Sequence, residues 1–259
     1  KKYLSLSLLT LVACTHNSAR LISSSTCTPV GNKGCAANEV CMSNNPAPVC
    51  KPAVADAVLP EIALPFKKGV EVTCTHSAEE GSHSWPNAFY ALDLATPYDQ
   101  PAPDILASES GKAFVFLGED GKPCPQYGSA QYSKIDDCGS GWGNSVKILH
   151  QGGYASFYVH LDKVTVKNGQ SVRRGQKIGT MGWTGLAGHR HLHWSVQKMP
   201  GFSLAEWESK MFWDGQSVPF KFVALQDGEK KTFDTRTLLC PHANLGQIPG
   251  LVQPKFIGL

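Results

Sequence analysis

The chain has 259 residues, of which 42% are hydrophobic and 17% charged, and its formal net charge is +3. A chain of this length and apolar content can bury one sizeable core and a small accessory module, which excludes a disordered protein. The charge is close to neutral and no long run of lysine or arginine occurs, so we expect no nucleic-acid partner and only a weak preference for an anionic one.

Residues 1–13 have the pattern of an export signal. Lys1 and Lys2 precede an apolar run that is too short to span a bilayer. The run ends at Leu11-Val12-Ala13-Cys14, which resembles a bacterial lipobox, in which the cysteine is lipidated; an ordinary cleaved signal is the alternative. We therefore expect an envelope protein that is anchored to the membrane through lipidated Cys14. Because Thr15 follows the cysteine, the expected place in a Gram-negative host is the outer membrane, facing the periplasm.

Nine cysteines leave eight if Cys14 is lipidated, and an even number in an exported chain indicates disulfides. After a tether at 14–26, four of them lie in the Gly-, Asn- and Pro-rich segment 27–50, which is too small to hold a core and is expected to be stapled by two bridges. The absence of a Cys-x-x-Cys pair among them disfavours a zinc ribbon. Residues 51–63 are expected to be a linker. The four cysteines are Cys27, Cys35, Cys41 and Cys50.

The main domain is expected at 64–240, followed by a tail at 241–259. Short runs of β-branched and aromatic residues between Gly, Pro, Asn and Asp turns predict a mainly β fold with an antiparallel sheet. Cys124 and Cys138 bracket an insertion at 118–143, which has the composition of a long loop, and we expect a disulfide across it. By elimination Cys74 would pair with Cys240.

Two strand patterns in this domain carry polar groups among apolar neighbours. The segment 82–97 has a polar turn at Pro86-Asn87 and then places Asp93 in an apolar run, where a carboxylate needs a cation. The segment 155–161 alternates, so that Ala155, Phe157 and Val159 are expected to face inward, with Ser156, Tyr158 and His160 on the opposite face. His150 ends another strand, where a hydrogen-bonded structural role is expected.

The segment 188–196 carries a His-x-His pair on a predicted strand. Alternate side chains of a strand point to the same face, so His191 and His193 should project together with Ser195. Two imidazoles on one polar face are typical of a metal site, although a purely structural pair is the alternative. A hydrolytic zinc site takes about three protein ligands and leaves one position to water, so one further His and a carboxylate are required. The residues expected to face the core are Leu192, Trp194 and Val196.

Together these motifs resemble the lysostaphin-type, LytM-like zinc endopeptidases, which cut the peptide bridges of bacterial peptidoglycan. The resemblance rests on His83 and Asp93, on the Tyr-x-His-Leu at 158–161 and on the His-Leu-His-Trp at 191–194, in the family's order. It covers roughly 64–222. It implies a catalytic domain built as an antiparallel β-sheet with a duplicated hybrid motif, and one Zn²⁺ per chain.

Carried over residue by residue, the resemblance implies that His83, Asp93 and His193 bind zinc. The catalytic residues would be His160 and His191, which flank the attacking water and the scissile carbonyl. Nine residues separate His83 from Asp93 where three are usual, but the family's longer-spaced form, with a Tyr-Ala-x-Asp strand, fits the sequence at 90–93. His76 is the alternative ligand to His83.

The function implied is the hydrolysis of peptide bonds in peptidoglycan, in a cross-bridge or a stem peptide, during cell-wall remodelling. One alternative is a catalytically silent relative that binds the wall or activates an amidase. Such regulators, by the resemblance, have typically lost zinc ligands, so the five intact positions favour the enzyme. A second alternative is an exported zinc protease with protein substrates, whose site would look the same.

Overall fold

The computed structural model describes residues 59–77, 81–85, 87–118, 121–129, 138–198, 215–238, 240 and 253–259, the isolated residues 205 and 208, and the backbone of 39–42 and 49–52. The expected signal segment, Cys14, the tether, Cys27 and Cys35 lie outside these residues. Within the described part of the chain, no helix has the length and apolar character needed to cross a membrane.

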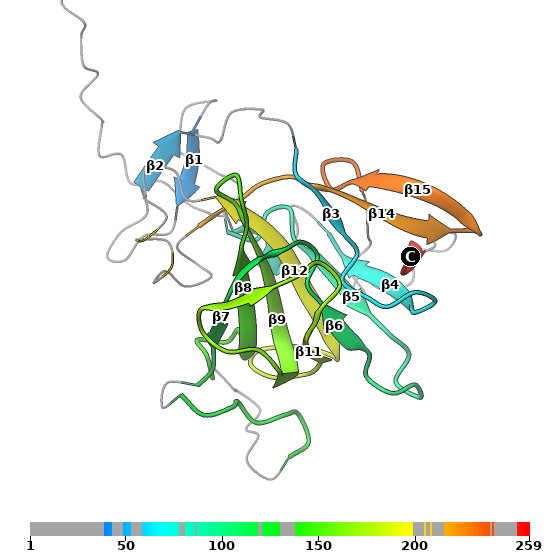
Figure 1. Ribbon diagram of the computed structural model, residues 1–259, viewed down its shortest axis with the longest axis horizontal. Coiled ribbons are helices and arrows are strands. Elements are labelled where there is room, and N and C mark those ends of the chain that lie inside the picture. The colour runs from blue at the N-terminus through cyan, green and yellow to red at the C-terminus, as the bar shows by residue number, and fades with distance from the viewer. Residues whose placement is uncertain are drawn as a thin grey trace, which may run out of the picture.

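The main structural element is one sheet of fourteen strands. Its continuous path runs β10-β7-β8-β9-β12-β5-β4-β16-β14-β15, with β11, β6, β13 and β3 attached beside it (Figure 1). The strands are β3 (Glu61–Ala63), β4 (Glu71–His76), β5 (Leu92–Ala95), β6 (Asp104–Leu106), β7 (Gly111–Phe116), β8 (Asn144–Leu149), β9 (Ala155–Val164), β10 (Gln170–Val172), β11 (Lys177–Met181), β12 (His191–Lys198), β13 (Gln216–Ser217), β14 (Lys221–Gln226), β15 (Glu229–Asp234) and β16 (Lys255–Ile257).

The prediction of a mainly β fold is confirmed, but the sheet is mixed and not purely antiparallel. The difference arises at β3, which pairs with β14 in parallel. This strand lies in the segment expected to be a linker, and β16, which pairs with β4 and β14, lies in the expected tail. Ile62 and Phe256 at their centres are fully buried, so both segments contribute to the core of the sheet.

Two apolar clusters cover the two faces of the central strands. The larger one contains Leu192, Trp194 and Val196, as the alternation of β12 predicted. A smaller cluster packs on the opposite face and contains Phe157 and Val159 of β9. Strands covered on both faces lose the alternation of buried and exposed residues, which explains the continuous burial of β8 and of the first seven residues of β9. The smaller cluster comprises Ala88, Ala91, Leu149, Ala155, Phe157 and Val159.

Both disulfides expected in the main domain are confirmed. Cys74 bonds to Cys240, and Cys124 bonds to Cys138. The first joins residues 166 positions apart, and a cross-link over so long a loop removes denatured-state entropy worth up to about 5 kcal/mol. In the cysteine-rich segment, β1 (Glu39–Met42) and β2 (Val49–Pro52) form a separate antiparallel pair in which the backbone of Cys41 lies opposite that of Cys50.

Candidate metal and catalytic site

The register of three neighbouring strands aligns the polar side chains of the site. His193 of β12 lies directly opposite Asp93 of β5, and Asp93 lies opposite His76 of β4. Residues opposite each other in antiparallel strands project to the same face at a Cβ separation of about 5 Å. The strand pairing itself therefore gathers these three side chains, which come from segments far apart in the sequence.

Two of these groups, Asp93 and His193, form a small triangle of donor atoms with His83. His83 Nε2 lies 3.2 Å from Asp93 Oδ1 and 3.1 Å from His193 Nδ1, and the last two atoms are 3.0 Å apart. Four ligands at the usual zinc distances of about 2.0–2.1 Å would be separated by about 3.3–3.4 Å in a tetrahedron. The two imidazoles and the carboxylate therefore fit one face of a tetrahedral zinc site and leave its fourth position to the pocket.

His83 reaches the triangle from a short 3-10 helix, η2 (Gly81–Ser84), and is fully buried. Its Nδ1 lies 3.0 Å from the carbonyl oxygen of Ser77. A carbonyl only accepts hydrogen bonds, so this contact places the ring hydrogen on Nδ1 and leaves the Nε2 lone pair for a metal.

His76 lies beside the triangle and contacts two of its members, His83 and Asp93. Its ring stacks on that of His83, with centroids 4.0 Å apart and planes 2° from parallel. Its Nδ1 lies 3.5 Å from Asp93 Oδ2, the carboxylate oxygen that faces away from the triangle. The donor atoms of His76, His83 and Asp93 all lie within 4.8 Å of one another, so the alternative ligand remains beside the site.

A β-bulge brings His160 to the same pocket. Val159 lies opposite His193 and Tyr158 opposite Trp194, so regular alternation would place His160 with Tyr158 on the core face. The register between β8 and β9 shifts at this point, and His160 has a φ of 64°, in the left-handed region. As a result its ring lies 4.8 Å from that of His191.

This bulge corrects the expected alternation of segment 155–161. Tyr158 is fully buried in the main core, and its hydroxyl accepts a hydrogen bond from the Ser108 backbone. The period of two predicted that Tyr158 and His160 share a face of the sheet. In the structure they lie on opposite faces. One extra residue in a strand re-aims the following side chain, and such bulges recur beside active sites.

The two histidines proposed as catalytic are held in matching tautomers. His160 Nδ1 lies 2.8 Å from the carbonyl oxygen of Thr184, and His191 Nδ1 lies 2.8 Å from that of His189. Each carbonyl requires a hydrogen on the Nδ1 that faces it, so Nε2 is the atom of each ring that gains or loses the second proton. His191 Nε2 lies 3.6 Å from Asp93 Oδ1, which shows that this nitrogen points toward the triangle.

Burial and mutual charge set the protonation states here. Burial lowers the pKa of His193 to about 4, against the opposing attraction of Asp93. Burial, followed by the charges of His191 and His193, holds the pKa of His160 well below its usual value. For Asp93, burial raises the pKa, but the surrounding histidines outweigh it and lower that pKa well below its ordinary value. At neutral pH Asp93 is therefore ionised, whereas His160 and His193 are neutral, and metal binding by Asp93 and His193 requires these states.

A pocket of about 300 Å³ lies over these groups. The C-terminal end of the insertion, from Ser140 to Trp142, forms one wall, and Leu186 to His189 form another. Part of the loop expected to be functional therefore borders the site. Asp93, His160, His191 and His193 all line this pocket.

Sequence reasoning identified the titratable groups but missed the groups that orient them. Ser77 and Thr184 act through backbone carbonyls, which leave no residue-type signal. Asn144 is buried and donates from Nδ2 to the Leu161 carbonyl at 3.0 Å, while its Oδ1 accepts from the Cys124 backbone at 2.7 Å. It thereby ties the β9 bulge to the insertion. Asn144 stands in a strand that also carries Ser145 and Lys147, so the residue type gave no distinct signal in the sequence.

Residues 89–205 match the model described as Peptidase family M23, a span that includes Asp93, His160, His191 and His193 and begins after His83. The uncharacterized lipoprotein YgeR of Escherichia coli is 39% identical over 95 residues, which are 37% of this chain and 38% of YgeR. The peptidoglycan DD-endopeptidase ShyB of Vibrio cholerae is 50% identical over 54 residues, 21% of this chain and 13% of ShyB.

The murein hydrolase activator NlpD of Escherichia coli is 35% identical over 92 residues, 35% of this chain and 24% of NlpD. The chain thus covers less than two fifths of the length of each of these relatives. Among solved structures, the catalytic domain of lysostaphin from Staphylococcus simulans is 22% identical, with 59% of this chain and 88% of that chain covered and a TM-score of 0.34. The sequence matches agree with the motifs, and the chain contains a domain of peptidase family M23, the LytM/lysostaphin-like family.

Proposed function

We propose that the protein is a zinc-dependent endopeptidase that hydrolyses peptide bonds of bacterial peptidoglycan, in cross-bridges or stem peptides. The observation that carries the proposal is the triangle of His83 Nε2, Asp93 Oδ1 and His193 Nδ1, with edges of 3.0–3.2 Å. Beside this triangle lie the imidazoles of His160 and His191, whose Nδ1 atoms face backbone carbonyls, so that Nε2 is the atom at which each ring accepts a proton.

In the proposed mechanism, His83, Asp93 and His193 hold the zinc. When bound there, zinc supplies Lewis-acid chemistry, lowering the pKa of a coordinated water and polarising the scissile carbonyl. One of His160 and His191 accepts the proton of the attacking water at Nε2. The same ring returns this proton to the leaving amine as the peptide bond breaks. The other ring takes up a proton from solvent and donates a hydrogen bond from Nε2 to the oxygen on which negative charge develops. The carbonyls of Thr184 and His189 keep both rings oriented throughout.

The relatives support this proposal and also define its alternatives. The name of ShyB assigns that protein a peptidoglycan endopeptidase activity, whereas the name of NlpD assigns that protein the activation of a murein hydrolase. All five metal-binding and catalytic positions are filled here. Asp93, His160, His191 and His193 line one pocket, and His83 contacts Asp93 and His193, which favours the enzyme over a wall-binding or amidase-activating regulator. An exported zinc protease with protein substrates would have the same site. The products released from peptidoglycan and from proteins distinguish that alternative from the proposed function.

The same proposal places the protein in the cell envelope, anchored by a lipid on Cys14 to a membrane, the outer membrane if the host is Gram-negative. The lipobox-like residues 11–14 support it, as does the relative YgeR, whose name describes a lipoprotein. Peptidoglycan would then lie within reach of the anchored domain.

The test is incubation of the purified protein with intact peptidoglycan, with zinc and with a chelator, beside a His193→Ala variant. Released muropeptides are identified by mass spectrometry. New termini at a peptide bond, lost with the chelator and in the variant, would establish the endopeptidase and identify the bond. Zinc binding without release, combined with stimulation of a purified amidase, would replace the proposal with the regulator.

A further inference from the structure

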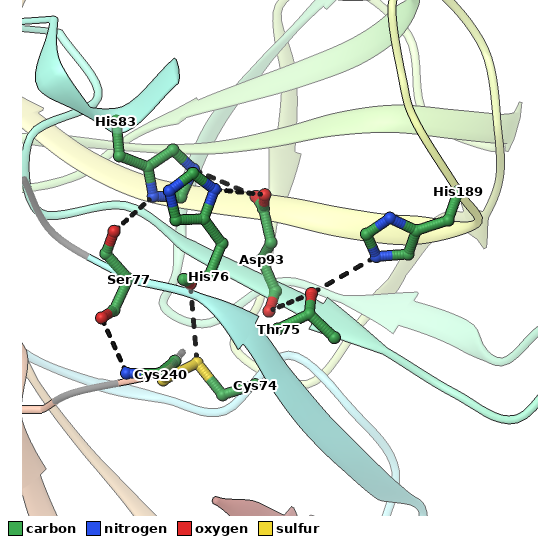
Figure 2. The surroundings of a disulfide bond; sticks show 8 residues. All are labelled: Cys74, Thr75, His76, Ser77, His83, Asp93, His189 and Cys240. Carbon is green, nitrogen blue, oxygen red and sulfur yellow. Dashed lines mark hydrogen bonds and ion pairs between the residues drawn. A yellow bond between two sulfur atoms is a disulfide. The ribbon is translucent and has the colours of Figure 1, made fainter. Parts of the chain in front are cut away.

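The end of strand β4 contacts two of the three proposed zinc ligands from outside the triangle. His76 Nδ1 faces Asp93 Oδ2 at 3.5 Å, and the Ser77 carbonyl oxygen lies 3.0 Å from His83 Nδ1. Figure 2 shows both groups on the same short stretch of chain, directly beside the Cys74–Cys240 disulfide. One segment of four residues, 74–77, therefore orients a carboxylate and an imidazole of the site.

A bulge at Thr75 makes the first of these contacts possible. Cys74 pairs with Leu94 and His76 with Asp93, so Thr75 is an extra residue in the β4–β5 ladder. Its hydroxyl donates to the backbone carbonyl of Asp93 at 3.3 Å. In an unbroken ladder Thr75 would lie opposite Asp93, and His76 would point to the other face. The extra residue thus directs the His76 imidazole to the carboxylate.

The segment is anchored on both sides. Cys74 is fully buried and bonded to Cys240, and the backbone N–H of Cys240 donates to Ser77 Oγ at 2.8 Å. The disulfide and this hydrogen bond enclose Thr75 and His76 between two fixed points. His76 is further packed by its parallel stack on His83, at a centroid separation of 4.0 Å.

We propose that His76 and Ser77 are positioning residues of the metal site and that the Cys74–Cys240 disulfide sets zinc affinity by fixing them. His76 holds Oδ2 of Asp93, so that Oδ1 remains directed at the metal, and the Ser77 carbonyl holds the ring of His83. This inference rests on the proposed zinc site. Partners of metal ligands of this kind typically change metal affinity by about 10–100-fold when they are removed.

The first test uses two substitutions of His76 in the full chain. His76→Leu keeps most of the side-chain volume but removes Nδ1, the atom that faces Asp93 Oδ2. In His76→Asn, the side-chain amide nitrogen takes the place of Nδ1. Zinc affinity is measured by competition with a chromogenic chelator, and the ligand set by the absorption spectrum of the cobalt(II)-substituted protein. We expect His76→Leu to bind zinc about 10–100-fold more weakly, His76→Asn to bind almost as the wild type does, and all three cobalt spectra to agree.

The second test compares the two disulfides. Replacing Cys74 and Cys240 together by alanine should weaken zinc binding by about tenfold, because the anchored segment is released. Replacing Cys124 and Cys138 together by alanine is the matched control, since that bridge contacts none of the three proposed ligands, and should leave zinc affinity unchanged. If the first double variant does not fold, Ser77→Ala removes the acceptor of the Cys240 N–H with the disulfide intact and should weaken zinc binding in the same direction.

The outcomes separate this inference from the proposed function. A loss of affinity in His76→Asn as large as in His76→Leu, with an altered cobalt spectrum, would make His76 a ligand and overturn its positioning role. Equal zinc affinity in the wild type and every variant would overturn the inference and leave the proposed function standing. A wild-type protein that binds no zinc would overturn both.

Discussion

His193 and Asp93 lie directly opposite each other in the β12–β5 pair, and His193 Nδ1 is 3.0 Å from Asp93 Oδ1. The strand pairing brings these two groups together without a metal, because the buried apolar residues on either side of them fix the register. These residues are Leu192 and Trp194 on β12 and Leu92 and Leu94 on β5. A site that is prearranged in this way spends little of its metal-binding free energy on ordering the chain.

This arrangement makes Asp93→Asn a direct test of metal binding. The amide has the shape of the carboxylate but no charge, so the fold should persist while zinc affinity falls. Ligand binding to the folded state alone stabilises it by about 2.7 kcal/mol at a concentration 100 times the dissociation constant. We therefore expect zinc to raise the melting temperature of the wild type and not that of Asp93→Asn. An equal rise in both proteins would remove Asp93 from the metal site.

The role of His160 predicts a separation of catalysis from metal binding. Asparagine tolerates the left-handed backbone of this position, where φ is 64°, and can still donate to the Thr184 carbonyl. His160→Asn should therefore keep zinc affinity but lose about 10²–10⁴-fold in hydrolysis rate, the usual contribution of a general acid or base. His193→Ala is the comparison, because it should lose both properties. Parallel losses in the two variants would argue that His160 is itself a ligand.

Sequence reasoning succeeded where the alternation of a strand is unbroken. In β12 the apolar residues at every second position are buried in the main core, and His191 and His193 share the opposite face. The same period failed in β9, because the bulge before Leu161 turns His160 to the face of Val159. A bulge depends on the partner strand, so its position is absent from the local pattern.

The edges of the sheet were also beyond sequence reasoning. β3 and β16 are three residues long, which is too short for a period to be recognised. Both lie near prolines that are typical of a linker or a tail. β3 is recognised as a strand by its pairing with β14, and β16 by its pairing with β4 and β14. The disulfides, by contrast, were predictable because the number of cysteines and the bracketed insertion left few pairings.

Asn144 should be a strong determinant of stability. Asn144→Ala leaves the backbone N–H of Cys124 without its acceptor and removes the donor that reaches Leu161 O and Asp162 O in a buried region. A stranded buried polar group costs about 1–3 kcal/mol, so we expect a loss of about 2–3 kcal/mol. Urea unfolding should show a lower midpoint at an unchanged slope.

Asn168→Ala is the matched control for this substitution. Its Oδ1 also accepts a backbone hydrogen bond, from Val115 at 2.6 Å, but at an exposed site where water can replace it. The loss there should be below about 1 kcal/mol. Similar losses in the two variants would show that Asn144 does not act through the buried network.

We expect His150 to contribute free energy of unfolding that is lost in acid. It is buried, with Nδ1 2.9 Å from the Ser110 carbonyl oxygen and Nε2 2.8 Å from Ser156 Oγ, which supports the structural role expected for it. Burial lowers the pKa of this imidazole below its usual value of 6.5. As the pH falls below 6.5 the unfolded chain takes up a proton before the folded protein does. The contribution is therefore fully present above that pH and is lost progressively until the pH reaches the lowered pKa of the folded state.

His150→Asn isolates this contribution, because the amide can still donate to the Ser110 carbonyl but does not titrate. In the metal-free proteins, His160 and His193 add a pH dependence of the same sign to both, since burial lowers their pKa values as well. The free energy of unfolding, measured by urea titration from pH 7.5 downward, should therefore fall less steeply below about pH 6.5 in the variant. Curves of equal steepness would mean that His150 is protonated as readily in the folded chain as in the unfolded one, which its burial argues against.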